Sequence, residues 1–334
     1  MKKVAIALSH GHAAKWLQVI IHSLKSMKND TEADIYVAAT WPGHPSIKAL
    51  TETPLGDNVT VMDCVRRKQS HATGLDEILE LIWDKGYEYM FCTETDCRAM
   101  KPGWLDWYIQ QIESKPNVGM AGLFWKEGTN HYNINPSATL YRVDMLKKYH
   151  TEVTDNNEGV FWHPRGNKTD TDGGMDSNIK DVAGVFSETR GIKDPTPAQK
   201  QQIEQGVPQA SWFEPGSWLY YRSIGEYEFV AVPNDHIYQQ WGGGRAPEGT
   251  YYGSKADPWL IHYWGGTRCY DWLKHPINDR FVLGCVQGWT IRENNVWKAT
   301  VPEEYQQIVH EIMLEVNAEE MMRKHTNMFV PEVM

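Results

Sequence analysis

The sequence predicts an α/β protein whose mainly parallel β-sheet carries helices on both faces. Short apolar runs alternate along the chain with segments whose apolar residues recur at helical spacing. Strands that alternate with helices are joined by right-handed crossovers, and these cover both faces of a parallel sheet. At 334 residues and 41% hydrophobic, the chain is long enough to bury a large core.

The individual elements follow from these patterns. Apolar runs bounded by turn or loop residues predict strands over residues 2–8, 35–39, 59–62, 87–93, 118–124, 137–142 and 228–233. Apolar residues at helical spacing predict helices over residues 17–27, 75–82, 105–112 and 305–316, with a short helix after residue 142. In such sheets ligands bind beyond the carboxyl ends of the strands, so the residues that follow each strand are the first candidates for a site.

Residues 151–215 differ from the rest, because they are polar and rich in Asp, Asn, Gly and Pro. A long segment of this kind inside a compact domain is typical of a functional lid or of an acceptor-binding insertion. We therefore expect an insertion at this point of the chain.

Composition limits the classes of partner. The formal net charge is −10, so the molecule as a whole does not attract nucleic acid or an anionic membrane. There is no apolar stretch of about twenty residues, which predicts a protein without a membrane span. The odd number of cysteines, five, and the absence of a signal-peptide profile after Met1 predict a reduced, soluble and cytoplasmic chain.

The sharpest chemical signal is a pair of carboxylates where a buried strand ends. Glu94 and Asp96 stand one residue apart after the apolar run 87–93. Alternate carboxylates at a strand exit can converge on one hard cation, and oxygen ligands suit Mn²⁺ or Mg²⁺. Such an ion would neutralise the charge that develops on a departing diphosphate. A solvated acidic turn has the same pattern, and 43 acidic residues generate several such triplets by chance.

Several motifs in a fixed order surround this pair. They are residues 2–8 with the Ser9 loop, His71-Ala72-Thr73-Gly74-Leu75, Glu94-Thr95-Asp96, Lys101-Pro102-Gly103-Trp104-Leu105, and His262 ahead of Gly265-Gly266-Thr267. In this order the motifs resemble the glycosyltransferase A fold, a Rossmann-like α/β fold, and in particular the broad family 2 of nucleotide-sugar glycosyltransferases. The triplet Glu94-Thr95-Asp96 is then a variant of that family's Asp-x-Asp motif.

The resemblance implies a glycosyltransferase domain over residues 1–290. Its nucleotide-sugar-binding half is expected over residues 1–125, and its acceptor half over residues 126–290, which contains the insertion 151–215. Residues 291–334 form a C-terminal helical tail in this division.

The resemblance also implies a donor site. The residues that it places against the nucleotide-sugar are Ser9, Trp41, Arg67, Glu94, Thr95 and Asp96. Asp96 would ligate the divalent cation, Glu94 would contact the donor ribose or reach the metal through water, and His262 would complete the metal shell. Without the family, a histidine after an apolar pair is more often packed than a ligand, and His236 competes for the role. The position of Arg67 is equally consistent with a solvated residue of the basic cluster Arg66-Arg67-Lys68, which would not contact the donor.

A base is needed to deprotonate the acceptor if the reaction inverts configuration, and a carboxylate is the usual choice. Two residues compete for this role. Glu214 begins the segment 214–222, whose pattern of residues is similar to the family's acidic motif before a helix. The second acidic position of that motif is missing here. Asp176 closes a further acidic run that no predicted strand precedes.

The sequence therefore predicts a metal-dependent glycosyltransferase that moves a sugar from a nucleotide diphosphate donor, with UDP-sugars expected and inversion as the default. The acceptor and the oligomeric state are not identified; a glycan, a small molecule, a protein or a modified nucleobase all fit. A nucleotidyltransferase is the alternative enzyme, disfavoured because the loop after residue 8 lacks a basic glycine-rich signature. A non-catalytic carbohydrate-binding protein would also account for the 15 Trp residues.

Overall fold

The computed structural model describes residues 3–10, 21, 24–25, 27–40, 58–65, 71–95, 97–127, 131–152, 159–161, 216, 219, 223, 225–241, 244–262, 290–293 and 296–299. The chain divides into two compact units. The first comprises residues 1–11, 28–94 and 102–234, and the second comprises residues 12–27, 95–101 and 235–334.

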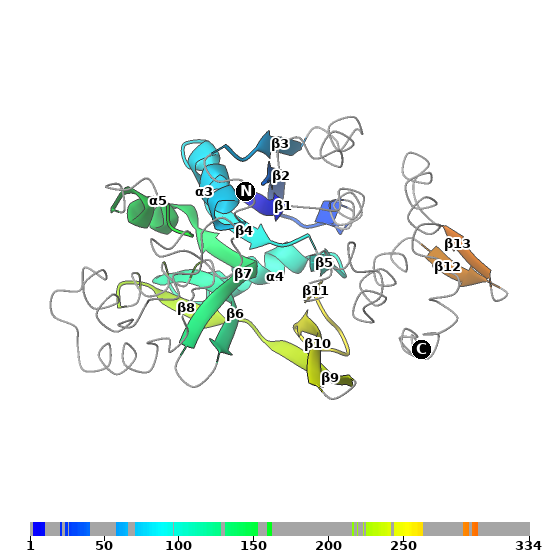
Figure 1. The fold of residues 1–334 in the computed structure, drawn as a ribbon. Coiled ribbons are helices and arrows are strands. Elements are labelled where there is room, and N and C mark those ends of the chain that lie inside the picture. The colour runs from blue at the N-terminus through cyan, green and yellow to red at the C-terminus, as the bar shows by residue number, and fades with distance from the viewer. Residues whose placement is uncertain are drawn as a thin grey trace. The chain divides into compact units, whose positions relative to one another are not determined.

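The first unit is built on a seven-stranded sheet with the strand order β3-β2-β1-β4-β7-β6-β8 (Figure 1). Its strands are β1 (Lys3–His10), β2 (Glu32–Ala39), β3 (Val59–Asp63), β4 (Tyr89–Thr93), β6 (Val118–Glu127), β7 (His131–Arg142) and β8 (Glu228–Ala231). Neighbours from β3 to β4 pair in parallel, as do β6 and β8, whereas β7 is antiparallel to both β4 and β6. The predicted mainly parallel sheet is confirmed.

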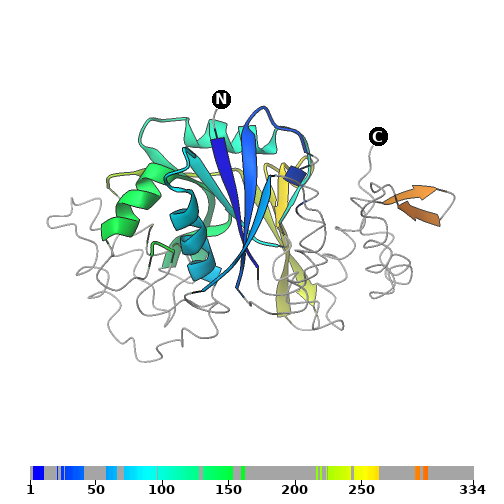
Figure 2. The ribbon, with the colours of Figure 1, turned by 90° about the horizontal axis from the view of Figure 1, so that it is seen from above.

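Three helices whose bounds fall within the described residues lie on the two faces of this sheet, which Figure 2 shows from above. They are α3 (His71–Ile82), α4 (Trp104–Ile112) and α5 (Val143–Glu152). The alternation of side chains along β4 assigns the faces, because successive residues of a strand point to opposite sides. Met90 and Cys92 join the core cluster that contains α3 and α5. Phe91 instead meets Trp104 and Tyr108 of α4, with ring centroids 5.0 and 4.9 Å away. The predicted α/β class with helices on both faces is thus confirmed.

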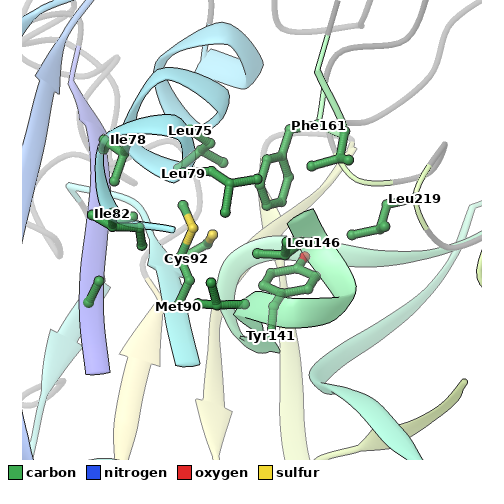
Figure 3. Close-up of a cluster of buried hydrophobic side chains, with 14 of the residues drawn as sticks. Leu75, Ile78, Leu79, Ile82, Met90, Cys92, Tyr141, Leu146, Phe161 and Leu219 are labelled. Carbon is green, nitrogen blue, oxygen red and sulfur yellow. The ribbon is translucent and has the colours of Figure 1, made fainter. Parts of the chain in front are cut away.

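The core between α3, α5 and the sheet is drawn in Figure 3. Leu75, Leu79 and Tyr141 are fully buried in it, and the Tyr141 and Phe161 rings meet edge to face with centroids 5.4 Å apart. Removing a large apolar side chain from water contributes about 1.5–3 kcal/mol. Because Phe161 lies far along the chain from α3, its burial attaches the segment around residue 161 to this face of the sheet.

The second unit contains a four-stranded sheet in the order β5-β11-β10-β9. The strands are β5 (Cys97–Ala99), β9 (Asn234–Trp241), β10 (Gly244–Tyr252) and β11 (Leu260–His262). The sequence patterns do not predict this sheet. They also do not predict the antiparallel hairpin of β12 (Thr290–Glu293) and β13 (Val296–Ala299).

Three expectations concern parts of the chain that are not described. The helix over residues 305–316 lies outside the described residues, as do most of the helix over residues 17–27 and most of the insertion 151–215. In the portion of the chain that the structure covers, no helix has both the length and the apolar character that crossing a bilayer requires.

Candidate functional site

Helix α3 begins against the carboxyl ends of β1 and β2, which is where a parallel sheet binds its ligands. Gly74 makes this approach possible, because a Cβ atom there would lie 2.8 Å from Ser9 Oγ, 3.1 Å from Thr40 Cγ2 and 3.2 Å from Ala38 Cβ. Ser9, Thr40 and Thr73 are all buried. Ser9, which the sequence assigns to the donor site, therefore lies at the interface between the helix and the end of β1.

Glu77 of α3 holds the residues that follow β3. Its side chain is buried, and its two carboxylate oxygens accept a hydrogen bond from the Val65 amide at 3.1 and 3.0 Å. The Cys64 thiol donates to Oε1 of the same group at 3.4 Å. Hydrogen bonds to charged groups contribute about 1.5–3 kcal/mol, and a buried carboxylate without them is strongly disfavoured. Glu77 therefore fixes the chain one residue before the Arg66-Arg67-Lys68 cluster.

Asp76, the preceding residue of α3, is 1% exposed and holds a different segment. One of its carboxylate oxygens accepts the Val160 amide at 2.7 Å and the Phe161 amide at 3.0 Å. Gly159 has φ +68°, and a Cβ atom there would lie 2.1–2.5 Å from the carboxylate atoms of Asp76. The turn at residues 159–161 can approach the carboxylate this closely only because residue 159 is a glycine.

The turn at residues 159–161 also receives the returning chain. The Gly216 amide donates to the Phe161 carbonyl at 3.3 Å, and Leu219 joins the same buried cluster as Phe161. A backbone hydrogen bond therefore joins Phe161 to Gly216, and we call residues 159–161 with Gly216 the neck. Asp76 is the side chain of α3 that binds the neck.

The Cys92 thiol lies near Asp76 within the core. Burial raises the pKa of this thiol, and the negative charge of Asp76 raises it further. A thiol with a raised pKa stays protonated and is a poor nucleophile or metal ligand. Cys64, Cys92 and Cys97 are all buried.

The acidic motif follows β4. Thr93 is the last residue of β4 and is fully buried. Glu94 is partly buried, and Thr95 is 5% exposed. Asp96 lies outside the described residues, and β5 begins at the next position, Cys97. The residues between β4 and β5 are therefore the predicted Glu94-Thr95-Asp96 triplet.

His262 belongs to the second unit, in which β11 pairs with β5. The two strands are antiparallel, and the register places His262 opposite Cys97, Ile261 opposite Arg98 and Leu260 opposite Ala99. His262 is fully buried. The Met100 amide extends the pairing by donating to the Trp259 carbonyl at 2.9 Å, and the Lys101 ammonium lies 3.9 Å from the centre of the Trp259 ring. A buried histidine thus faces the residue that follows Asp96 in the chain.

The remaining predicted site residues fall in other parts of the chain. Those outside the described residues are Trp41, Arg67, Asp96, Asp176 and Glu214, and nothing is described of the His236 side chain. The described residues contain no group of three or more His, Cys, Asp and Glu side chains that could hold a metal ion. Because Asp96 is not among them, the metal site stays a prediction.

Sequence reasoning gave no role to Asp76, Glu77 or Gly159. Helical spacing puts the two acids off the face that carries Leu75 and Ile78, where charged residues are ordinarily solvated, so the pattern did not indicate their burial. Gly159 could not be found either, because its requirement comes from a contact with a residue far away in the sequence.

Comparison with known proteins gives matches among solved structures. No protein-family model matches the chain, and no curated protein does. A mannosyltransferase from Pyrobaculum calidifontis, PcManGT, in complex with GDP-Man and Mn²⁺, is 10% identical over 98% of this chain and 76% of its own, with a TM-score of 0.39. TarS from S. aureus, in complex with UDP-GlcNAc, is 13% identical over 45% of this chain and 47% of its own, with a TM-score of 0.33. A 4-diphosphocytidyl-2C-methyl-D-erythritol synthase from Anaerococcus prevotii is 11% identical over 46% of this chain and 78% of its own, with a TM-score of 0.34.

We predict that Gly159→Ala destabilises the first unit more than Gly86→Ala does. Both glycines have positive φ, +68° and +78°, but a Cβ atom at Gly86 would meet nothing within 4 Å. The backbone conformation alone costs about 1–2 kcal/mol for a residue with a side chain. The clash with Asp76 raises the cost at residue 159 to about 2–5 kcal/mol. Urea unfolding of the two variants measures the difference, and equal losses would contradict the close contact.

Proposed function

We propose that this chain is a metal-dependent glycosyltransferase that transfers a sugar from a nucleotide diphosphate donor to an acceptor, with inversion at the anomeric carbon. The observation that carries the proposal is the pairing of β11 with β5, which sets His262 opposite the residue that follows Asp96. The mainly parallel sheet supports it, because β4 of that sheet ends at the acidic triplet.

Chain geometry brings the backbone of Asp96 close to His262, and we propose that the Asp96 side chain, which precedes β5, is turned toward the imidazole. Neighbouring Cα atoms are about 3.8 Å apart, and residues that face each other in an antiparallel pair have Cα atoms about 4.5–5.5 Å apart. Cys97 is the neighbour of Asp96 in the chain and the partner of His262 in the sheet. A carboxylate and an imidazole that reach the same point are a donor set that suits a divalent transition metal such as Mn²⁺.

In the proposed reaction, Asp96 and His262 would hold the divalent ion, Mn²⁺ or Mg²⁺, and Glu94 would contact the donor ribose or reach the metal through water. When bound, the ion stabilises the negative charge of the leaving diphosphate. Glu214 or Asp176 takes the proton of the acceptor hydroxyl. The acceptor oxygen then forms a bond to the anomeric carbon while the bond from that carbon to the diphosphate breaks. Ser9, Trp41, Arg67 and Thr95 complete the proposed donor site.

The donor is proposed from the resemblance noted in the sequence, which favours a UDP-sugar. Of the solved structures described above, TarS is in complex with UDP-GlcNAc, and PcManGT is in complex with GDP-Man and Mn²⁺. A donor panel should therefore contain several UDP-sugars and GDP-mannose.

We predict release of the nucleoside diphosphate when the protein is incubated with the matching donor and Mn²⁺. The slow hydrolysis that glycosyltransferases catalyse without an acceptor suffices for this assay, because water can take the place of the acceptor hydroxyl. Chelation by EDTA should abolish the release, and excess Mn²⁺ should restore it. Release of pyrophosphate from a nucleoside triphosphate and a sugar phosphate would indicate a nucleotidyltransferase instead. Absence of turnover with every donor would favour a binding protein.

We predict that Asp96→Asn lowers kcat at least about 100-fold, because the metal contributes several kcal/mol to the stabilisation of the leaving group. His262→Gln should raise the Mn²⁺ concentration for half-maximal activity by about 10–100-fold. The matched control is Asp84→Asn, which removes an exposed carboxylate that pairs with Lys147 and should leave kcat unchanged. Full activity of Asp96→Asn at saturating Mn²⁺ would contradict the assignment.

A further inference from the structure

A cysteine and a histidine lie directly opposite each other in the four-stranded sheet of the second unit. Strands β5 and β11 are antiparallel, and their register pairs Cys97 with His262. Side chains that lie opposite each other in an antiparallel pair project from the same face of the sheet, with Cβ atoms about 4.5–5.5 Å apart. The thiol and the imidazole are therefore neighbours on one face.

This is the buried face of the sheet. Cys97 and His262 are both fully buried. The residues that continue this face over the paired positions of β5, β10 and β11 are also fully buried, and they are Ala99, Thr250, Tyr252 and Leu260. The alternate positions Arg98 and Tyr251 are partly exposed, as the alternation of side chains along a strand requires. The sulfur and the ring nitrogens thus lie in surroundings that are mainly apolar and shielded from water.

Sulfur and imidazole nitrogen are the ligands that Zn²⁺ and similar ions take. Thiolate selects soft or borderline ions, imidazole suits the same ions, and Mg²⁺ prefers oxygen. In zinc sites the metal lies about 2.3 Å from sulfur and about 2.0–2.1 Å from nitrogen. Two side chains whose Cβ atoms are about 4.5–5.5 Å apart can both reach one ion at these distances without a change of register.

The place of this pair in the chain points to the same chemistry. Cys97 directly follows Asp96, for which the sequence predicts the role of a metal ligand. Among the residues that the structure describes, no third His, Cys, Asp or Glu side chain joins Cys97 and His262 in a metal-binding group. A further protein ligand therefore comes from elsewhere in the chain, and Asp96 is the acidic residue nearest to Cys97 in the sequence.

We propose that Cys97 and His262 bind one divalent metal ion, and that the sulfur makes this an ion of the Zn²⁺ class and not Mg²⁺. The inference deepens the proposed function, in which His262 binds the metal, and it adds a ligand that the family resemblance does not imply. As the bond between sulfur and metal forms, the thiol loses its proton to solvent, and no electron is transferred. Cys97 then sets which metal the site prefers.

Cobalt is the probe for this site, because Co²⁺ takes the place of Zn²⁺ and shows a sulfur-to-cobalt charge-transfer band only when a thiolate binds it. The full chain, reduced and stripped of metal with a chelator, is titrated with Co²⁺ and followed by absorbance. The test variants are Cys97→Ser and His262→Gln. The matched control is Cys92→Ser, which removes another fully buried thiol, from β4 of the first unit.

We expect the wild type and Cys92→Ser to show the charge-transfer band and Cys97→Ser to lose it. His262→Gln should raise the dissociation constant for Co²⁺ by at least about 10-fold, because even residues that only support the direct ligands contribute about 10–100-fold to affinity. Zn²⁺ should displace the bound Co²⁺, and a large excess of Mg²⁺ should not. Absence of the band in the wild type, or its survival in Cys97→Ser, would overturn the proposal.

X-ray absorption by the Zn²⁺-loaded wild type keeps the test decisive if Cys97→Ser fails to fold. A sulfur neighbour at about 2.3 Å and nitrogen neighbours at about 2.0–2.1 Å are expected. The sulfur neighbour should remain when each of the other cysteines is replaced singly by serine. Neighbours of nitrogen and oxygen alone, or a sulfur neighbour that is lost with another cysteine, would reject Cys97 as a ligand.

The same samples separate this inference from the proposed function. Turnover of a nucleotide-sugar donor with Mn²⁺, without a thiolate signal with Co²⁺, would leave the glycosyltransferase standing and reject Cys97 as a ligand. A thiolate signal that depends on Cys97 and His262, without turnover of any donor, would keep the metal site and reject the proposed function.

Discussion

The burial of two carboxylates beneath the chain segments that they bind is the constraint on which the first unit depends. A buried carboxylate is tolerated only when hydrogen-bond donors surround it, and α3 buries two in succession. The backbone amides of residues 65, 160 and 161 supply these donors. The position of α3, of the chain after β3 and of residues 159–161 are therefore coupled through these hydrogen bonds.

The position of α3 on the sheet determines where these two carboxylates lie. Gly74 lets the first turn of α3 lie against the ends of β1 and β2, and Leu75 and Leu79 pack in the core between the helix and the sheet. The helix thus begins at the ligand-binding edge of the sheet and packs on one of its faces. Val65 follows the carboxyl end of β3, so the segment that Glu77 binds lies at the edge where α/β proteins bind their ligands.

Much of the first unit could be predicted from the sequence, because local patterns mark its strands and helices. The apolar runs 2–8, 35–39 and 59–62 all became strands of the sheet, and the helical spacing from Leu75 to Ile82 became most of α3. Strand ends were less accurate: β2 begins at Glu32, whose polar neighbours hide the start of the strand. The parallel order of the strands followed from their alternation with helices.

The second unit could not be predicted, for physical reasons that its residues show. β5 has three residues and β10 contains Pro247 and Gly249, so neither carries the alternation that marks a strand. Their stability comes from pairing between distant segments, such as Cys97 with His262, which local patterns do not encode. The same limit applies to Asp76 and Gly159, whose roles arise from a contact between residues that are far apart in the chain.

The central claim is that Asp96 and His262 bind one divalent ion together with the diphosphate of the donor. A crystal structure of the full chain with UDP and Mn²⁺ tests it most directly. We predict a single ion bound by a carboxylate oxygen of Asp96, a ring nitrogen of His262 and oxygens of the UDP diphosphate. An ion bound to UDP with either side chain outside its coordination shell would contradict the account.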